Sequence, residues 1–240
     1  MRREILVSAS TRESWVALLE DQQLVEVLFD RPDQDRLIGD IYLGRVDAVI
    51  PGIQAAFVDI GAEKAGFLHV SDLVYDDQDE DEEGGGGGGR RRRRDFPPIQ
   101  DQLQKGQQIL VQVTKEPIST KGPRLTAQVS LPGRFLVYIP SSTHVGVSRK
   151  IDDRGERARL RSMAREIVPE GQAGVIVRTV GEEVTKETLE QEFKRLHQNW
   201  KKIEKKARGA KRAPAPIHRE AKLISGVIRD LFSDKFESLT

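Results

Sequence analysis

The chain has 240 residues, of which 37% are hydrophobic, so it can build one large or two small folded domains. It contains no cysteine, which excludes disulfides, thiol nucleophiles and cysteine zinc sites and fits a reducing compartment, so we expect a cytoplasmic protein. With 39 basic and 38 acidic residues, the net charge of +1 gives no evidence for nucleic-acid binding. No apolar run is long enough for a signal peptide or a membrane-spanning segment.

The first half of the sequence is predicted to be rich in β-strands. Residues 3–29 alternate apolar with other side chains and predict a small β meander. Five further strand-like runs, bounded by glycine- and proline-containing turns, are found at 41–50, 55–60, 66–70, 109–113 and 124–130. These five runs predict a compact β-barrel.

A low-complexity segment at 76–94 interrupts the predicted barrel. It joins an acidic run, six glycines and five arginines, a composition that cannot bury apolar surface, so we expect a disordered insertion. The arginines are compatible with a nucleic-acid-binding arm, and equally with a solvated loop in which the acidic run neutralises them. Both interpretations remain open from the sequence.

The second half of the sequence predicts a separate α/β unit. Residues 135–139 and 174–179 read as strands, and 153–168 read as a helix. Thr185 is a plausible N-cap for a long helix. The apolar stripe of that helix consists of Leu189, Phe193, Leu196, Trp200 and Ile203. Prolines at 213–216 are expected to break the chain before a last amphipathic helix over 223–231 and a truncated terminal strand, which suggests a fragment.

Two phenylalanines and a histidine are predicted on the outer surface of the barrel. The two-residue period of a strand places Phe57 opposite to Val58, and places Phe67 and His69 opposite to Leu68. Exposed rings on neighbouring strands can stack on bases, because every base presents a π face. The alternative, equally open from alternation alone, is that the two rings pack against an adjoining domain.

Several short segments resemble one known family. The glycines and aromatic residues of 44–60, followed by 66–71, resemble the S1 RNA-binding motif. Further segments that are similar to the ribonuclease E/G family are 41–44, 121–122, 131–133, 146–149 and 177–179.

The resemblance implies a multi-domain α+β fold. In this plan an S1 domain of the OB type, residues 38–127, is inserted into a split ribonuclease-H-like domain whose two segments are 1–37 and 217–240. An α/β 5′-sensor domain follows at 128–216. The acidic, glycine and arginine insertion departs from the family, in which the connection is usually shorter.

The resemblance also implies two sites. The S1 positions that contact RNA in the family match Phe57, Phe67 and Lys121, and His69 shares their face. The 5′-monophosphate pocket matches Gly133, Val137, Arg178 and Thr179. Without the resemblance, Lys121 would be a solvated turn lysine and Arg178 a surface arginine. Arg149 lies in a matching segment, and whether it contacts RNA is open.

The expected function is the RNA-binding and 5′-sensing part of a Mg²⁺-dependent endoribonuclease that cleaves single-stranded RNA in RNA processing and decay. The resemblance implies a homo-oligomer and places the magnesium-binding aspartates beyond residue 240, so we expect this chain alone to be inactive. We assign it no metal, because its four histidines lie too far apart in the sequence for ligand spacing. We assign it no catalytic residue, because none of its carboxylates stands in the isolated apolar setting of an acid/base pair. The alternatives are a non-catalytic S1 adaptor and a protein-interaction module that docks through the Trp200 face of the long helix.

Overall fold

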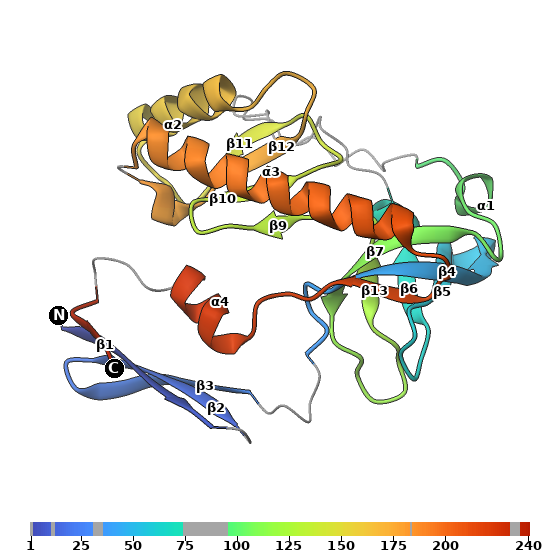
Figure 1. Ribbon diagram of the computed structural model, residues 1–240, viewed down its shortest axis with the longest axis horizontal. Coiled ribbons are helices and arrows are strands. Elements are labelled where there is room, and N and C mark those ends of the chain that lie inside the picture. The colour runs from blue at the N-terminus through green and yellow to red at the C-terminus, as the bar shows by residue number, and fades with distance from the viewer. Residues whose placement is uncertain (1, 11–12, 31–35, 74–95, 183, 231–235) are drawn as a thin grey trace, which may run out of the picture. The chain divides into compact units, whose positions relative to one another are not determined.

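The computed structural model describes residues 2–10, 13–30, 36–73, 96–182, 184–230 and 236–240 (Figure 1). The chain divides into two compact units. Unit 1 contains residues 1–37 and 220–240, and unit 2 contains residues 38–219. The predicted disordered insertion at 76–94 lies outside the described residues.

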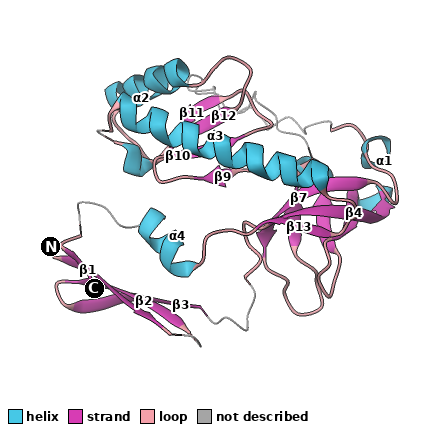
Figure 2. Cartoon of the chain, in the orientation of Figure 1, coloured by secondary structure: helices cyan, strands magenta, loops and turns pink. Residues whose placement is uncertain are grey.

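Unit 1 is a four-stranded sheet with one helix (Figure 2). The antiparallel strands β1 (Arg3–Ala9), β2 (Ser14–Glu20) and β3 (Gln23–Asp30) form the predicted meander, and β14 (Ser238–Leu239) pairs parallel to β1. Helix α4 (Leu223–Asp230) packs on β2 and β3, and the apolar core contains Ile5, Val16, Leu223 and Val227. The assignment of this unit to a ribonuclease-H-like domain stays a prediction.

The first half of unit 2 is a closed five-stranded barrel. It is formed by β4 (Ile41–Ile50), β5 (Ala55–Asp59), β6 (Gly66–His69), β7 (Gln108–Lys115) and β8 (Arg124–Thr126). The strand order is β4-β5-β6-β8-β7, a pairing of β7 with β4 closes the barrel, and β6 and β8 are parallel. This connectivity fits an OB-like fold and confirms the five predicted strands, except that β8 ends at Thr126 and not at residue 130. Three short helical turns lie beside the strands, namely η1 (Pro51–Ile53), η2 (Val70–Asp72) and α1 (Ile99–Gln102).

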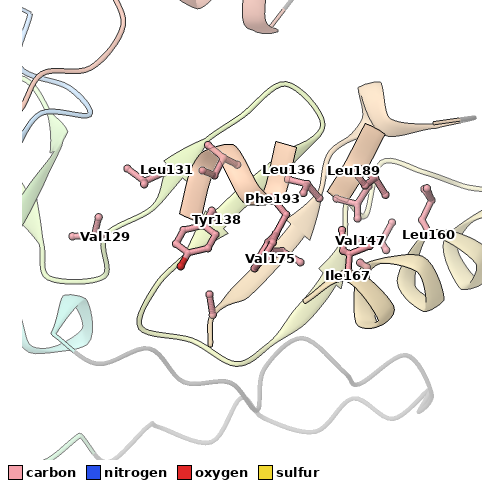
Figure 3. Packing of buried hydrophobic residues seen from close by; sticks show 14 of the residues in the cluster. Val129, Leu131, Leu136, Tyr138, Val147, Leu160, Ile167, Val175, Leu189 and Phe193 are labelled. Atoms are coloured by element: carbon pink, nitrogen blue, oxygen red, sulfur yellow. The ribbon is translucent and has the colours of Figure 1, made fainter. Parts of the chain in front are cut away.

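A second sheet and two helices form the rest of unit 2. The sheet has the order β11-β12-β10-β9, with β9 (Leu131–Pro132), β10 (Leu136–Ile139), β11 (Val145–Val147) and β12 (Gly174–Val177). Helix α2 (Arg154–Ile167) is capped by Asp153, and α3 (Lys186–Gly209) is capped by Thr185 as predicted. A short turn, η4 (Thr179–Gly181), follows β12. Apart from Val129, which precedes β9, the side chains labelled in Figure 3 come from these strands and helices, and all of them meet in one cluster.

Helix α3 connects this cluster to the barrel. Ile203, near its C-terminal end, belongs to the same buried cluster as Ile41 of β4 and as Phe193 in the N-terminal half of the helix. Figure 1 shows α3 running from the second sheet to the barrel. Trp200, the candidate docking residue, is half-buried and packs against this core. Its position is therefore explained by internal packing.

The prolines in the segment 213–216 separate α3 from α4 as predicted, but the segment also contributes to a strand that the sequence did not predict. Residues Ala215–His218 form β13, which pairs antiparallel with β4. Proline is tolerated there because β13 is an edge strand, whose outer N–H groups have no ladder partner to lose. The division between the units accordingly falls after Arg219. Arg219 donates to Asp40 Oδ2 at 2.5 Å and to the Tyr42 hydroxyl at 2.9 Å, which joins the end of β13 to the barrel.

Candidate nucleic-acid interface

Four side chains occupy one line of cross-strand partners on the barrel. Phe57 on β5 pairs with Phe67 on β6, Phe67 pairs with Arg124 on β8, and Arg124 pairs with Lys115 on β7. Partners in neighbouring strands point to the same face of a sheet. The line therefore presents two aromatic rings followed by two cationic side chains.

The two rings have the outward orientation that alternation predicts. Phe57 is 36% exposed and Phe67 is half-buried, whereas Val58 and Leu68 behind them are fully buried. The ring centroids lie 6.0 Å apart with an interplanar angle of 68°, an edge-to-face pair. This geometry leaves ring surface accessible for stacking on a flat ligand.

The loop between β7 and β8 forms one wall beside these rings. Ile118 and Lys121 exchange two backbone hydrogen bonds at 2.9 and 3.2 Å, and Lys64 Nζ donates to the Ser119 carbonyl at 2.8 Å. Gly122 follows so closely against Ala65 that a Cβ atom would collide with the Ala65 carbonyl oxygen. These contacts fix the backbone that carries Lys121, so the exposed ammonium starts from a defined position.

Rings and loop together enclose a groove of about 710 Å³. It is lined by Phe57, Lys64, Ala65, Phe67, Lys115, Glu116, Ile118, Thr120, Lys121, Gly122 and Arg124. Arg124 is paired with Asp72 at 3.0 Å, so the lysines are the cations best placed to meet an anionic ligand. The groove thus combines stacking rings with ammonium groups, as single-stranded nucleic-acid sites do. Sequence reasoning missed Lys64, Lys115 and Arg124, because only the strand register places them there.

His69 is on the same strand as Phe67 but serves a different neighbour. Its Nδ1 accepts from the Ser71 backbone N–H at 3.2 Å and is 2.8 Å from Ser71 Oγ. The ring thereby caps η2. It does not line the groove, so a contact between His69 and RNA stays a prediction.

The residues predicted to bind a 5′-phosphate lie together at one end of the second sheet. Arg178 directly follows β12; its Nη1 donates to the Gly133 carbonyl at 2.6 Å, and its backbone N–H donates to the Phe135 carbonyl at 2.8 Å. Val137 on β10 is half-buried and pairs with Ile176 of β12. Thr179 begins η4 immediately after Arg178. A guanidinium, a hydroxyl and a loop glycine are suitable groups for an anion.

Arg149 lies next to this group. It is exposed and follows β11, which runs parallel to β12, and the Ser148 backbone N–H donates to the Val177 carbonyl at 2.7 Å. The chain therefore leaves β11 beside the point where Arg178 leaves β12. A contact between Arg149 and RNA stays a prediction.

A buried carboxylate that the sequence reasoning missed holds the loop before β10. Glu192 on α3 accepts backbone N–H groups from Arg134, Phe135 and Leu136 at 2.8, 2.6 and 2.9 Å. It is 8% exposed, and a Cβ on Gly133 would approach its Cδ to 2.7 Å. One signal was present in the sequence, because a glutamate three residues after Leu189 lies on the buried stripe of the helix.

The described residues offer neither a metal site nor a membrane-spanning helix. Among them, no group of histidine, aspartate or glutamate side chains could hold a metal ion. No helix in the described part of the chain is long and apolar enough to cross a membrane.

The closed barrel with its aromatic pair, followed by an α/β sheet, defines a multi-domain protein built on an OB-like fold. The model of the Ribonuclease E/G family matches residues 130–240. Over 98% of its length the chain is 38% identical to ribonuclease G of Haemophilus influenzae and of Escherichia coli strain K12, covering 46% of each. It is also 36% identical to ribonuclease E of Synechocystis, of which it covers 32%. The chain belongs to the ribonuclease E/G family, and it spans less than half the length of these relatives.

Proposed function

We propose that unit 2 binds single-stranded RNA in the groove of the barrel. The observation that carries the proposal is the line Phe57, Phe67, Arg124 and Lys115, which puts stacking surface beside positive charge on one face. Stacking on rings is tolerant of base identity, and ammonium groups attract phosphates of any sequence. Phe57, Phe67 and Lys121 are the principal contacts, and the wall that contains Ile118 limits the groove.

The second part of the proposal is that the end of the second sheet holds a 5′-terminal monophosphate. A terminal phosphate carries more charge than a linking phosphate and gains more from charge-assisted donors. Arg178 and Thr179 supply these donors, while Gly133 and Val137 shape the pocket. Glu192 supports the arrangement, since it fixes the backbone next to Gly133.

For the whole protein, the names of the relatives support a role as an endoribonuclease in RNA processing. We propose that cleavage depends on Mg²⁺ and occurs in a homo-oligomer, and that the 240-residue chain contributes recognition without cleavage. The similarity over 98% of the chain does not favour a non-catalytic adaptor.

Binding of two oligoribonucleotides that differ only in a 5′-monophosphate or a 5′-hydroxyl tests both parts. We expect the chain to bind both RNAs, to prefer the monophosphate, and to leave the RNA intact in the presence of Mg²⁺. Arg178→Lys keeps the charge but removes the planar fork, so it should reduce this preference by about tenfold, or roughly 1.4 kcal/mol. Arg159→Lys on α2, where the arginine is paired with Glu156, is the matched control.

Each possible failure points to a different part of the proposal. No binding of either RNA would refute the RNA-binding groove. Equal affinity for the two 5′ ends would refute the sensor alone. Specific Mg²⁺-dependent cleavage would contradict the assignment of recognition only.

A further inference from the structure

The C-terminal half of α3 and the residues directly after it carry a concentration of positive charge that the proposed groove and sensor do not use. Between residues 200 and 212 there are seven basic residues and one acidic residue, although the whole chain has a net charge of only +1. The N-terminal half of the same helix, up to residue 199, is balanced, with three basic and three acidic residues. The charge is therefore localised.

All seven basic side chains belong to exposed residues, which are Lys201, Lys202, Lys205, Lys206, Arg208, Lys211 and Arg212. With 3.6 residues per turn, Lys201, Lys205 and Arg208 lie in one row along the helix, and Lys202 and Lys206 lie in a second row beside it. The apolar residues of α3 are on the opposite side, buried in the core. The two rows thus occupy the solvent face of the helix.

Most of this charge is not neutralised within the described residues. Glu204 pairs with Arg208 at 2.8 Å and with Lys201 at 3.7 Å. Within the described ranges, Lys202, Lys205 and Lys206 form no ion pair. In the N-terminal half, by contrast, Lys186 pairs with Glu166 and Lys194 with Glu190, each at 2.6 Å.

We infer that this face of α3, here called the basic face and consisting of Lys201, Lys202, Lys205, Lys206 and Arg208 together with Lys211 and Arg212 just beyond the end of the helix, binds the phosphate backbone of an RNA strand. The inference rests on the proposed RNA binding of unit 2. Lysines four residues apart are separated by about 6 Å along a helix, so they form a line rather than a pocket. A line of ammonium groups suits an extended polyanion better than one small anion.

The position of the helix supports RNA as the occupant. The N-terminal half of α3 holds the loop beside Gly133 through Glu192, and the C-terminal half packs against β13 at the barrel. The basic face therefore belongs to the element that links the two proposed RNA sites (Figure 1). An anionic membrane is a poorer partner, because the apolar stripe of α3 is buried and has nothing to insert into lipid.

The test compares a short and a long RNA. One OB fold covers roughly 4 to 16 nucleotides, so an oligouridylate of about 8 nucleotides fits the groove and one of about 30 extends beyond it. Lys202→Gln with Lys206→Gln should weaken binding of the long RNA about tenfold near 0.1 M salt and lower its salt-dependence slope by about 1.4, since each phosphate contact contributes about 0.7. Binding of the short RNA should not change.

Two controls use the same helix: the first makes the same change in charge at other lysines, and the second keeps the charge at the same two lysines. Lys186→Gln with Lys194→Gln removes two paired lysines and should leave the slope for the long RNA unchanged. Lys202→Arg with Lys206→Arg keeps both charges and should bind as the parent does. All three variants should show the circular dichroism of the parent, because the substitutions are exposed and glutamine and arginine are good helix formers.

Three results would overturn the inference. If both double glutamine variants bind the long RNA as the parent does, the basic face does not contact RNA, while the proposed groove stands. If the parent fails to bind even the short RNA, the proposed function fails and the inference with it. Binding to phosphatidylglycerol vesicles is measured for the parent and for Lys202→Gln with Lys206→Gln. If this variant binds the long RNA as the parent does but loses the binding of the parent to the vesicles, the partner of this face is a membrane.

Discussion

The edge-to-face pair of Phe57 and Phe67 makes a strong prediction at the scale of single residues. Either change to alanine removes a ring from the floor of the groove, and we expect it to weaken binding of single-stranded RNA by about 1 to 3 kcal/mol, the usual cost of one stacking aromatic. The fold should persist, because the buried partners Val58 and Leu68 remain. Titration with a labelled oligonucleotide and thermal unfolding measure the two effects.

Phe29 is the matched control for this prediction. It is also a strand phenylalanine, 49% exposed, and it lies 6.0 Å from Trp15 in unit 1. Phe29→Ala should leave RNA binding unchanged. Parental binding by both Phe57→Ala and Phe67→Ala would mean that the exposed rings do not stack on RNA, whereas unfolding of both would identify them as structural residues.

At the scale of the secondary-structure elements, Glu192 is the residue through which α3 fixes the loop before β10. Glu192→Gln replaces one carboxylate oxygen by an NH₂ group that faces backbone donors, so it should destabilise the protein by about 2 kcal/mol. It should also reduce the preference for 5′-monophosphorylated RNA, because the loop contains Gly133. Urea unfolding and paired binding measurements test the two effects.

Glu190→Gln, in the same helix, is the control for Glu192. Glu190 is paired with Lys194 on the surface, and an ion pair exposed to solvent contributes little to stability, so this change should leave stability nearly unchanged. If Glu192→Gln loses stability but keeps the preference for 5′-monophosphorylated RNA, the loop that Glu192 fixes does not contribute to 5′ recognition.

Tyr138 on β10 gives the contact between α3 and the second sheet a predicted pH dependence. Burial, and to a smaller extent the nearby charge of Glu204, raises the pKa of Tyr138 from 10 to about 12. The folded protein therefore keeps the phenol proton in a pH range where the unfolded chain releases it. The contribution to stability is complete below pH 10 and falls as the pH rises from 10 towards 12, by about 2 to 3 kcal/mol in total.

Urea unfolding at several pH values above neutrality tests this dependence. Tyr138→Phe should remove that part of the decline above pH 10, although it loses the hydrogen bond to His197 Nδ1 at 2.9 Å. An equally steep decline in the parent and in Tyr138→Phe would show that the phenol does not titrate as expected.

The same elements show what the sequence could and could not predict. The stripe of α3 and the outward direction of Phe57 follow from periods of 3.6 and 2, and the cap at Thr185 follows from its hydroxyl at the start of the helix. All three depend only on local geometry. The pairing of Phe67 with Arg124 and Lys115 depends on how distant strands align, and one sequence does not specify this register. Edge strand β13 was missed because its prolines indicate a break unless the neighbouring strand is known.

At the scale of the whole molecule, the family resemblance and the local patterns contribute different information. The resemblance grouped Gly133, Val137, Arg178 and Thr179, which lie at one end of the second sheet although 46 positions separate the first from the last. Alternation alone would have left Arg178 as a surface arginine. The sequence places Glu192 on the buried stripe of α3 and shows the basic residues at 200–212, but the three backbone donors of Glu192 and the lack of ion pairs at Lys202, Lys205 and Lys206 within the described residues become evident only from contacts.

The division into two units leads to a prediction for the whole chain. Unit 2 contains the closed barrel, the second sheet and the cluster that α3 shares between them, so its apolar core is formed by its own residues. We expect residues 38–219 to fold alone and to bind single-stranded RNA within about threefold of the whole chain, which corresponds to about 0.7 kcal/mol. Circular dichroism, thermal unfolding and RNA titration of this fragment test the prediction, and Phe57→Ala in the fragment should again weaken binding. A fragment that folds but does not bind RNA would show that unit 1 contributes directly to recognition, and an unfolded fragment would show that the two units fold as one.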